Sequence, residues 1–335
     1  MGGRRYGEHL LRMTKTRTRE SWIDWSKAIL IWLMVLGHAG LSGQPRMWVY
    51  AFHMPAFFII SGFLYKPHNW LLTLKKFCVP IAFFSLLNLG YVMLRMAAKG
   101  EPIDAGELFL RTTPPLYWRC NYGDYITLFR GVWFVVVLAC MRALSGDIPL
   151  FSFIRKHALW FIVLCLGYMT LEPLFESYTE ALHDYYAYKV IGCLPFMLIG
   201  MVMKTHREWF LHLSWKWLTV LAAAFAATTL TNGTADIWAY IFGRHYLLFF
   251  IAAIAGSIVL FSIFRATKPN TVIETFSTGT LLILGIHNPI LEVCHKGCEM
   301  LHLPYSSVAS SLLVMLLCYY PIKWANQHCP ILLGK

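Results

Sequence analysis

Charged residues are scarce in this chain. They make up 14% of its 335 residues, whereas a typical soluble domain contains about 25%. A soluble core of this size would need a larger charged surface to cover it. The composition therefore excludes a disordered chain, a coiled coil and an ordinary cytosolic enzyme. Hydrophobic residues account for 58%, so lipid is the expected solvent for most of the chain.

The sequence also lacks paired cysteine motifs and internal repeats. Its nine cysteines include one close pair, Cys294 and Cys298, and no second pair follows. Zinc sites usually combine two such pairs, so no metal is expected, while a disulfide and two inert thiols both remain open. Because no repeat, low-complexity tract or soluble segment is present, we expect one transmembrane domain over residues 1–335, with a basic tail over about 1–21.

Ten apolar runs are long enough to cross a bilayer. A helical span needs about 20 residues, and Gly, Pro and charged residues separate the runs. They lie at about 24–42, 47–65, 77–95, 125–144, 157–174, 185–203, 213–231, 245–264, 276–294 and 305–323. The prediction is an all-α polytopic membrane protein of about ten helices, with one long connection over 96–124.

The distribution of Lys and Arg predicts how the helices are oriented in the membrane. With the N-terminus in the cytoplasm, the cytoplasmic side holds 20 basic and 6 acidic residues, and the outer side holds 9 and 11. Cytoplasmic loops of membrane proteins are enriched in Lys and Arg. We therefore expect both termini in the cytoplasm and a multi-pass protein of the plasma (inner) membrane. The net charge of +12 indicates anionic lipid headgroups as partners and not nucleic acid.

Lys27 and His38 share one face of the first predicted span. They are 11 positions apart, which is within about 20° of three helical turns and about 16 Å along the axis. Lys27 falls at the cytoplasmic end and His38 near the outer end. Two interpretations stay open: a snorkelling lysine with an interfacial histidine, or a cavity with a cationic anchor below and a reactive group above.

His53 adds a second imidazole at the outer depth, because the second span runs from the outside inwards. Pro55 frees a backbone carbonyl there, and Ser61 and Gly62 permit close helix approach. The alternative is aromatic packing around a structural histidine.

Five more positions are candidates for the outer cavity. Arg130 and Trp133 lie in the fourth span, and His287, Asn288 and Glu292 interrupt the ninth. Glu292 lies one turn beyond His287, where it can orient a histidine. Each of these residues has a structural alternative, either snorkelling to the interface or an interhelical hydrogen bond.

Several spans carry short motif blocks in a fixed order. They are Arg19-x4-Asp24 and Lys27-x10-His38 in the first span, Phe52-His53-Met54-Pro55-x-Phe57-Phe58-x-x-Ser61-Gly62-Phe63 in the second, Trp133-Phe134 in the fourth, Leu194-Pro195-Phe196 through Gly200 in the sixth, and Ser277-Thr278-Gly279-Thr280-Leu281 with His287 in the ninth. This order resembles the acyltransferase-3 family, and within it the polysaccharide and fucose O-acetyltransferase branch. The resemblance implies ten membrane helices and transfer of an acyl group, usually acetyl from acetyl-CoA, to a hydroxyl of an extracytoplasmic glycan.

The resemblance also implies partners and roles. Acetyl-CoA is expected as a co-substrate, with no tightly bound cofactor, and the other partners are a glycan or glycolipid acceptor and membrane lipids. Lys27, Lys75 and Lys76 would hold the CoA phosphates. The third span has Lys75-Lys76 where the family often has Arg-x-x-Arg, and lysine cannot reproduce a bidentate grip on phosphate.

His38 is the expected catalytic base, since burial favours the neutral imidazole that can take a proton from a hydroxyl. His53 is expected beside it, and His53, Trp133 or a helix end would donate to the oxyanion. The residues expected to bind the acceptor are Arg130, Trp133, His287, Asn288 and Glu292. No Ser or Cys lies in an obvious nucleophile arrangement, which favours direct transfer or a transient acyl-histidine.

A transporter or flippase for a polysaccharide precursor or an acylated metabolite is the alternative function. In that case the polar residues would line a permeation path. Transporters usually contain related halves, and this chain has no internal repeat. Acyl transfer by the purified protein, compared with substrate uptake into proteoliposomes, distinguishes the two.

Overall fold

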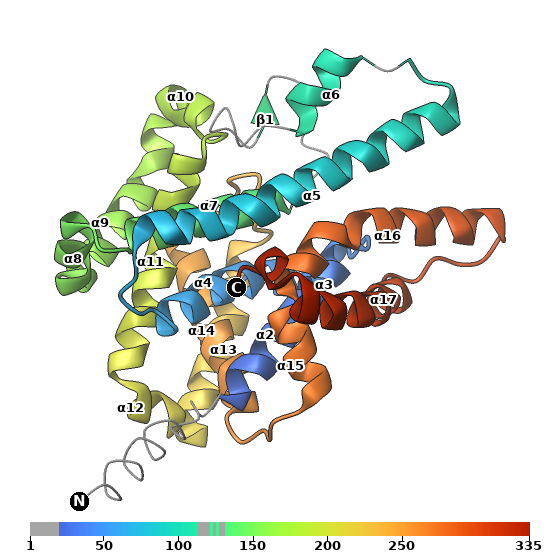
Figure 1. Ribbon diagram of the computed structural model, residues 1–335. Coiled ribbons are helices and arrows are strands. Elements are labelled where there is room, and N and C mark those ends of the chain that lie inside the picture. The colour runs from blue at the N-terminus through green and yellow to red at the C-terminus, as the bar shows by residue number, and fades with distance from the viewer. Residues whose placement is uncertain (1–19, 103, 113–120, 123–124, 127–130) are drawn as a thin grey trace, which may run out of the picture.

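The computed structural model describes residues 20–102, 104–112, 121–122, 125–126 and 131–335. The described chain is helical apart from a two-residue antiparallel pair, β1 (Asn121–Tyr122) with β2 (Tyr125–Ile126). This confirms the predicted all-α class. Figure 1 shows a bundle from which the long helix α5 and the α16–α17 hairpin project.

The helices follow the predicted runs in order. Their bounds are α2 (Ser21–His38), α3 (Gly43–Tyr50), α4 (His53–Phe63), α5 (Trp70–Lys99), α6 (Ala105–Thr112), α7 (Val132–Leu144), α8 (Pro149–Lys156), α9 (Ala158–Leu171), η2 (Glu172–Phe175), α10 (Glu176–Thr179), η3 (Glu180–Leu182), α11 (Tyr186–Thr205), α12 (Arg207–Leu211), α13 (Trp215–Asn232), α14 (Tyr246–Phe264), α15 (Thr271–Thr278), α16 (Thr280–Met300), α17 (Ser307–His328) and η4 (Pro330–Leu333). Two predicted runs are interrupted: 47–65 is divided into α3 and α4, and 276–294 into α15 and α16.

Several helices of the described chain have the length and the apolar composition of membrane spans. Within the described ranges, five helical segments are long and apolar enough to cross a membrane, or six if α7 and α8, which meet at a 93° bend, form one span. The five are Trp70–Lys99, Ala158–Leu182, Tyr186–Thr205, Tyr246–Phe264 and Ser307–His328. Large apolar side chains such as Leu94, Trp160 and Leu316 are exposed on these helices. The chain is therefore a multi-pass membrane protein.

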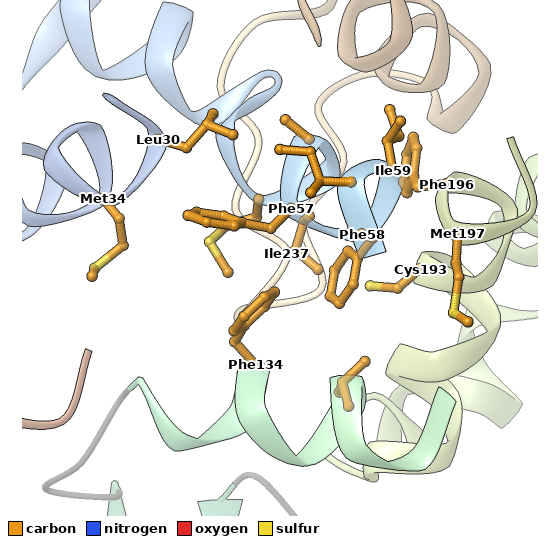
Figure 2. Packing of buried hydrophobic residues seen from close by; sticks show 14 of the residues in the cluster. Leu30, Met34, Phe57, Phe58, Ile59, Phe134, Cys193, Phe196, Met197 and Ile237 are labelled. Carbon is orange, nitrogen blue, oxygen red and sulfur yellow. The ribbon is translucent and has the colours of Figure 1, made fainter. Parts of the chain in front are cut away.

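Helix α4 forms the centre of the bundle, and all 11 of its residues are buried. It crosses α11 at two glycines: a Cβ atom on Gly62 would overlap the carbonyl oxygen of Met197, and one on Gly200 would overlap that of Ile59. Only glycine permits this approach of two backbones. The Phe-rich face of α4 packs on Phe134 of α7, as Figure 2 shows.

The break between α15 and α16 is attached to α2. Ser277 Oγ donates to Asp24 Oδ1 at 2.6 Å, and Lys27 Nζ donates to the carbonyl oxygen of Ser277 at 2.6 Å. At the break itself, a side chain on Gly279 would collide with Ile322 of α17. The motif blocks of the first and ninth spans therefore meet in space, although about 250 residues separate them in the sequence. The cysteines of the described chain, Cys294 and Cys298 among them, are free thiols.

Candidate active site

A cavity of about 1090 Å³ opens where α2 ends and α4 begins. Its lining includes His38 at the end of α2 and Gly40 just after it, Arg46 and Tyr50 of α3, His53 and Met54 of α4, Trp133 and Phe134 of α7, Asp236 and Trp238, and Asn288, Glu292 and His295 of α16. Arg130 lies outside the described residues. The other predicted acceptor-site residues line this cavity, except His287, which is fully buried beside His38.

His38 and His287 form a direct hydrogen bond across 249 positions of sequence. His38 Nδ1 lies 2.8 Å from His287 Nε2, and the ring centroids are 4.8 Å apart. His38 Nδ1 is also 3.4 Å from Asn288 Oδ1. The ninth span thus supports His38 with two neighbouring side chains, a contact that the sequence pattern did not reveal.

The surrounding acceptors fix the tautomer of this pair. His287 Nδ1 donates to the carbonyl oxygens of Leu284 at 2.9 Å and Ile283 at 3.1 Å. In neutral His287 the proton is therefore on Nδ1, and Nε2 accepts from His38 Nδ1. The lone pair of His38 is then on Nε2. Since His38 lines the cavity, this arrangement suits a general base whose other nitrogen is held in place.

His53 is oriented in a similar way. It is 3% exposed, and its Nδ1 donates to the carbonyl oxygen of Val49 at 2.8 Å. The neutral side chain therefore presents Nε2 as a hydrogen-bond acceptor. The expectation that His53 donates to an oxyanion is not met in this tautomer. Of the donors expected from sequence, a helix end and Trp133, whose indole nitrogen can only donate, remain.

Glu292 does not orient a histidine. Its carboxylate accepts from Tyr91 Oη at 2.7 Å and forms an ion pair with Arg95 Nη1 at 3.2 Å. Both partners come from α5, so this cluster connects α5 to α16 at the cavity wall. A second ion pair, Arg46 with Asp236 at 3.1 Å, also lines the cavity. Sequence reasoning assigned no role to either arginine.

A smaller cavity of about 210 Å³ adjoins the larger one. The two share four lining residues, Met34, Met54, Phe134 and Leu284. Lys27 lines the smaller cavity, so α2 contributes a residue to each cavity, as its helical spacing predicted. Lys75 and Lys76 are exposed on α5 and do not line it. Arg142 of α7 does, and its position in the cavity could not be foreseen from its place at the end of an apolar run.

His287 is expected to act as a positioning residue. An imidazolium that forms on His38 during proton transfer would be stabilised by the bond to His287 Nε2, and hydrogen bonds to charged groups contribute about 1.5–3 kcal/mol. His287→Ala should therefore lower kcat by about 10- to 100-fold without changing the affinity for the acyl donor.

The matched variant is His287→Gln, whose amide oxygen can accept the same bond. It should retain more activity than His287→Ala in steady-state measurements on folded protein. Equal kcat values for the two variants, or no loss in either, would contradict this role.

Comparison with known proteins gives a match to one family model. The family model described as an acyltransferase domain, that of the acyltransferase-3 family, matches residues 20–323. This range includes His38, His53 and His287 and the residues that line the two cavities, except Leu333 and Gly334. No curated protein and no solved structure that was compared matches the chain. The match of the family model to most of the chain shows that the protein belongs to the acyltransferase-3 family and is a membrane acyltransferase.

Proposed function

We propose that the protein transfers acetyl from cytoplasmic acetyl-CoA to a hydroxyl of an extracytoplasmic glycan or glycolipid, as in the polysaccharide and fucose O-acetyltransferase branch. One observation carries the proposal: His38, held by the buried His287, lines a large cavity that adjoins the smaller, narrow cavity lined by Lys27 and Arg142. Such a path suits a donor with an anionic head and a long thin arm.

The chemistry begins at His38. Nε2 takes the proton of the acceptor hydroxyl while its oxygen attacks the thioester carbon. The carbonyl oxygen becomes an oxyanion, for which the Trp133 indole is the proposed donor. The carbon–sulfur bond then breaks, and the departing thiolate takes the proton from the His38 imidazolium. His53 Nε2 accepts a hydrogen bond from the acceptor and aligns it. Proximity of the two substrates contributes further.

The donor is held at the other end of the path. Lys27 and Arg142 provide positive charge in the narrow cavity, and Lys75 and Lys76 add charge on the adjoining surface of α5. Arginine matches phosphate geometry better than lysine does, so Arg142 offsets the missing arginine pair of the third span. Asn288 and Glu292 line the larger cavity and are proposed to bind the acceptor there. Arg130 and His287 stay predicted acceptor-site residues.

We further propose ten membrane crossings in the plasma membrane with both termini in the cytoplasm. The charge distribution of +14 inside and −2 outside supports this orientation. The crossings would be α2, α3–α4, α5, α7, α9, α11, α13, α14, α15–α16 and α17. Membrane-impermeant thiol reagents should label a cysteine introduced after Asp236 in intact cells. Labelling of a cysteine near Lys156 or Arg207 would contradict this topology.

The direct test of the reaction is thiol release from acetyl-CoA by purified protein. The proposal predicts release that depends on His38, with labelled acetyl recovered in a glycan fraction. Uptake of an intact substrate into proteoliposomes without thiol release would instead support the transporter alternative.

A further inference from the structure

Ser61 of α4 has a buried hydroxyl that finds no hydrogen-bond partner among the described residues. Its side chain is 8% exposed. Buried serines elsewhere in the bundle donate to the carbonyl four residues back, as Ser26 does to Trp22 at 2.7 Å and Ser257 to Ala253 at 2.6 Å. A buried hydroxyl without a partner costs free energy. Where such a residue lines a cavity, a molecule bound in the cavity can supply the missing partner.

Ser61 is one of the residues that line the narrow cavity. Ser61 is eight residues inward from His53 on the same helix, about 12 Å along the axis. Helix α4 thus contributes one polar residue to each cavity, as α2 does with Lys27 and His38. Between the charged end and the histidines, most of the narrow lining is apolar, with Ile31, Phe57, Ile60, Phe77 and Leu138 among its residues.

The chemistry of this passage restricts the molecule that can fill it. A small, mostly apolar cavity whose lining includes two hydroxyl residues, Ser61 and Thr280, suits a thin, mostly apolar chain that carries a few hydrogen-bonding groups. The pantetheine arm of acyl-CoA has this character, because amides alternate with methylene groups between the thioester and the phosphates. A serine hydroxyl can accept from an amide N–H or donate to an amide oxygen.

We propose that Ser61 hydrogen-bonds an amide of the pantetheine arm, and that this contact selects pantetheine thioesters over simple alkyl thioesters. The inference rests on the proposed function, since it requires a CoA-type donor in the narrow cavity. It adds a specificity residue at a depth where neither the cationic end nor the histidines can recognise the donor.

The test measures donor affinity for Ser61→Ala in the full-length purified protein. The probes are acetyl-CoA, acetyl-pantetheine and the acetyl thioester of an unbranched alkanethiol, which has no amide. In Ser61→Ala, an amide of the bound acyl donor would be buried without its hydrogen-bond partner. On ordinary hydrogen-bond energies this loss weakens binding by about tenfold. The variant should therefore bind the first two probes about tenfold more weakly and the third unchanged.

Ser262→Ala is the matched control. Ser262 Oγ is also buried without a partner in the described chain, but Ser262 lines neither cavity of the path. Its substitution should leave all three affinities unchanged. Because each variant removes an unsatisfied hydroxyl, neither should lower the thermal unfolding temperature of the unliganded protein.

Two results would overturn the assignment of Ser61. One is an acetyl-CoA affinity equal to that of Ser262→Ala, and the other is an equal loss for the amide-free thioester, which would indicate a packing effect. Thiol release on the same samples separates this inference from the proposed function. Wild-type protein that binds acetyl-CoA through Ser61 but releases no thiol would contradict the reaction and leave the binding site intact. Failure of the wild-type protein to bind acetyl-CoA would contradict both the proposed function and the role of Ser61.

Discussion

His38→Ala should lower thiol release from acetyl-CoA by about 100-fold or more, the usual contribution of a general base. The affinity for acetyl-CoA should survive, because the cationic end of the path at Lys27 lies about 16 Å away along α2. Binding and release are measured on the same purified variant. The expected pattern is a collapse of the chemical step in a protein that still binds its donor.

His212→Ala provides the control for this substitution. Its side chain is 79% exposed and lines neither the larger nor the smaller cavity. It should release thiol at the wild-type rate. Full activity in folded His38→Ala protein would show that His38 is not the catalytic base and would favour the transporter alternative.

The second large effect concerns folding. Gly62→Ala and Gly200→Ala should each strongly reduce the yield of monodisperse protein, because the added methyl group overlaps a backbone carbonyl of the facing helix. Overpacking in a core costs about 1–3 kcal/mol when side chains can adjust. Here the two helices themselves must separate, so the cost should lie at or above that range, against a total stability of about 5–15 kcal/mol.

Gly90→Ala and Gly297→Ala are the matched substitutions. Both residues are helical, and an added Cβ atom meets no neighbouring atom within 4 Å at either position. Their yield and thermal unfolding temperature should equal those of wild type or rise slightly, since alanine favours helix more than glycine does. Wild-type stability in Gly200→Ala would show that α4 and α11 do not cross as closely as described.

Composition and spacing were sufficient for the secondary structure and for the positions of single residues along a helix. Apolar runs separated by Gly, Pro and charge gave the order of the helices, and the 11-residue spacing placed Lys27 and His38 on one face. The interruption between α3 and α4 and the bend after α7 were not foreseen. At that bend, Gly146 packs against the backbone of Trp70, a tertiary contact that local sequence does not encode.

The contacts between helices could not be predicted. These helices are apolar on all sides, so no polar face indicates which neighbour each side meets. His38 and His287 were both candidates, but their bond depends on how α2 packs against α16. The same reason explains why Glu292 was expected beside a histidine and lies instead against Tyr91 and Arg95 of α5.

The lysines of the third span illustrate a different limit. A lysine at the predicted cytoplasmic end of an apolar run can either line a path inside the bundle or face outward, and the sequence does not distinguish the two. The structure exposes Lys75 and Lys76, while Arg142 from the fourth run enters the narrow cavity. The sequence predicts the position of a residue along its helix, but it does not predict which neighbour the residue faces.

According to the proposed function, acetyl crosses the membrane while CoA does not. The most direct test is to determine from which side of the membrane the protein uses acetyl-CoA. Sealed inside-out and right-side-out membrane vesicles, prepared from cells that produce the protein, are given acetyl-CoA carrying a labelled acetyl group. The account predicts that inside-out vesicles incorporate the label into material within their lumen and release CoA outside, and that right-side-out vesicles do neither. Equal incorporation in both preparations, or entry of intact acetyl-CoA into the lumen, would contradict it.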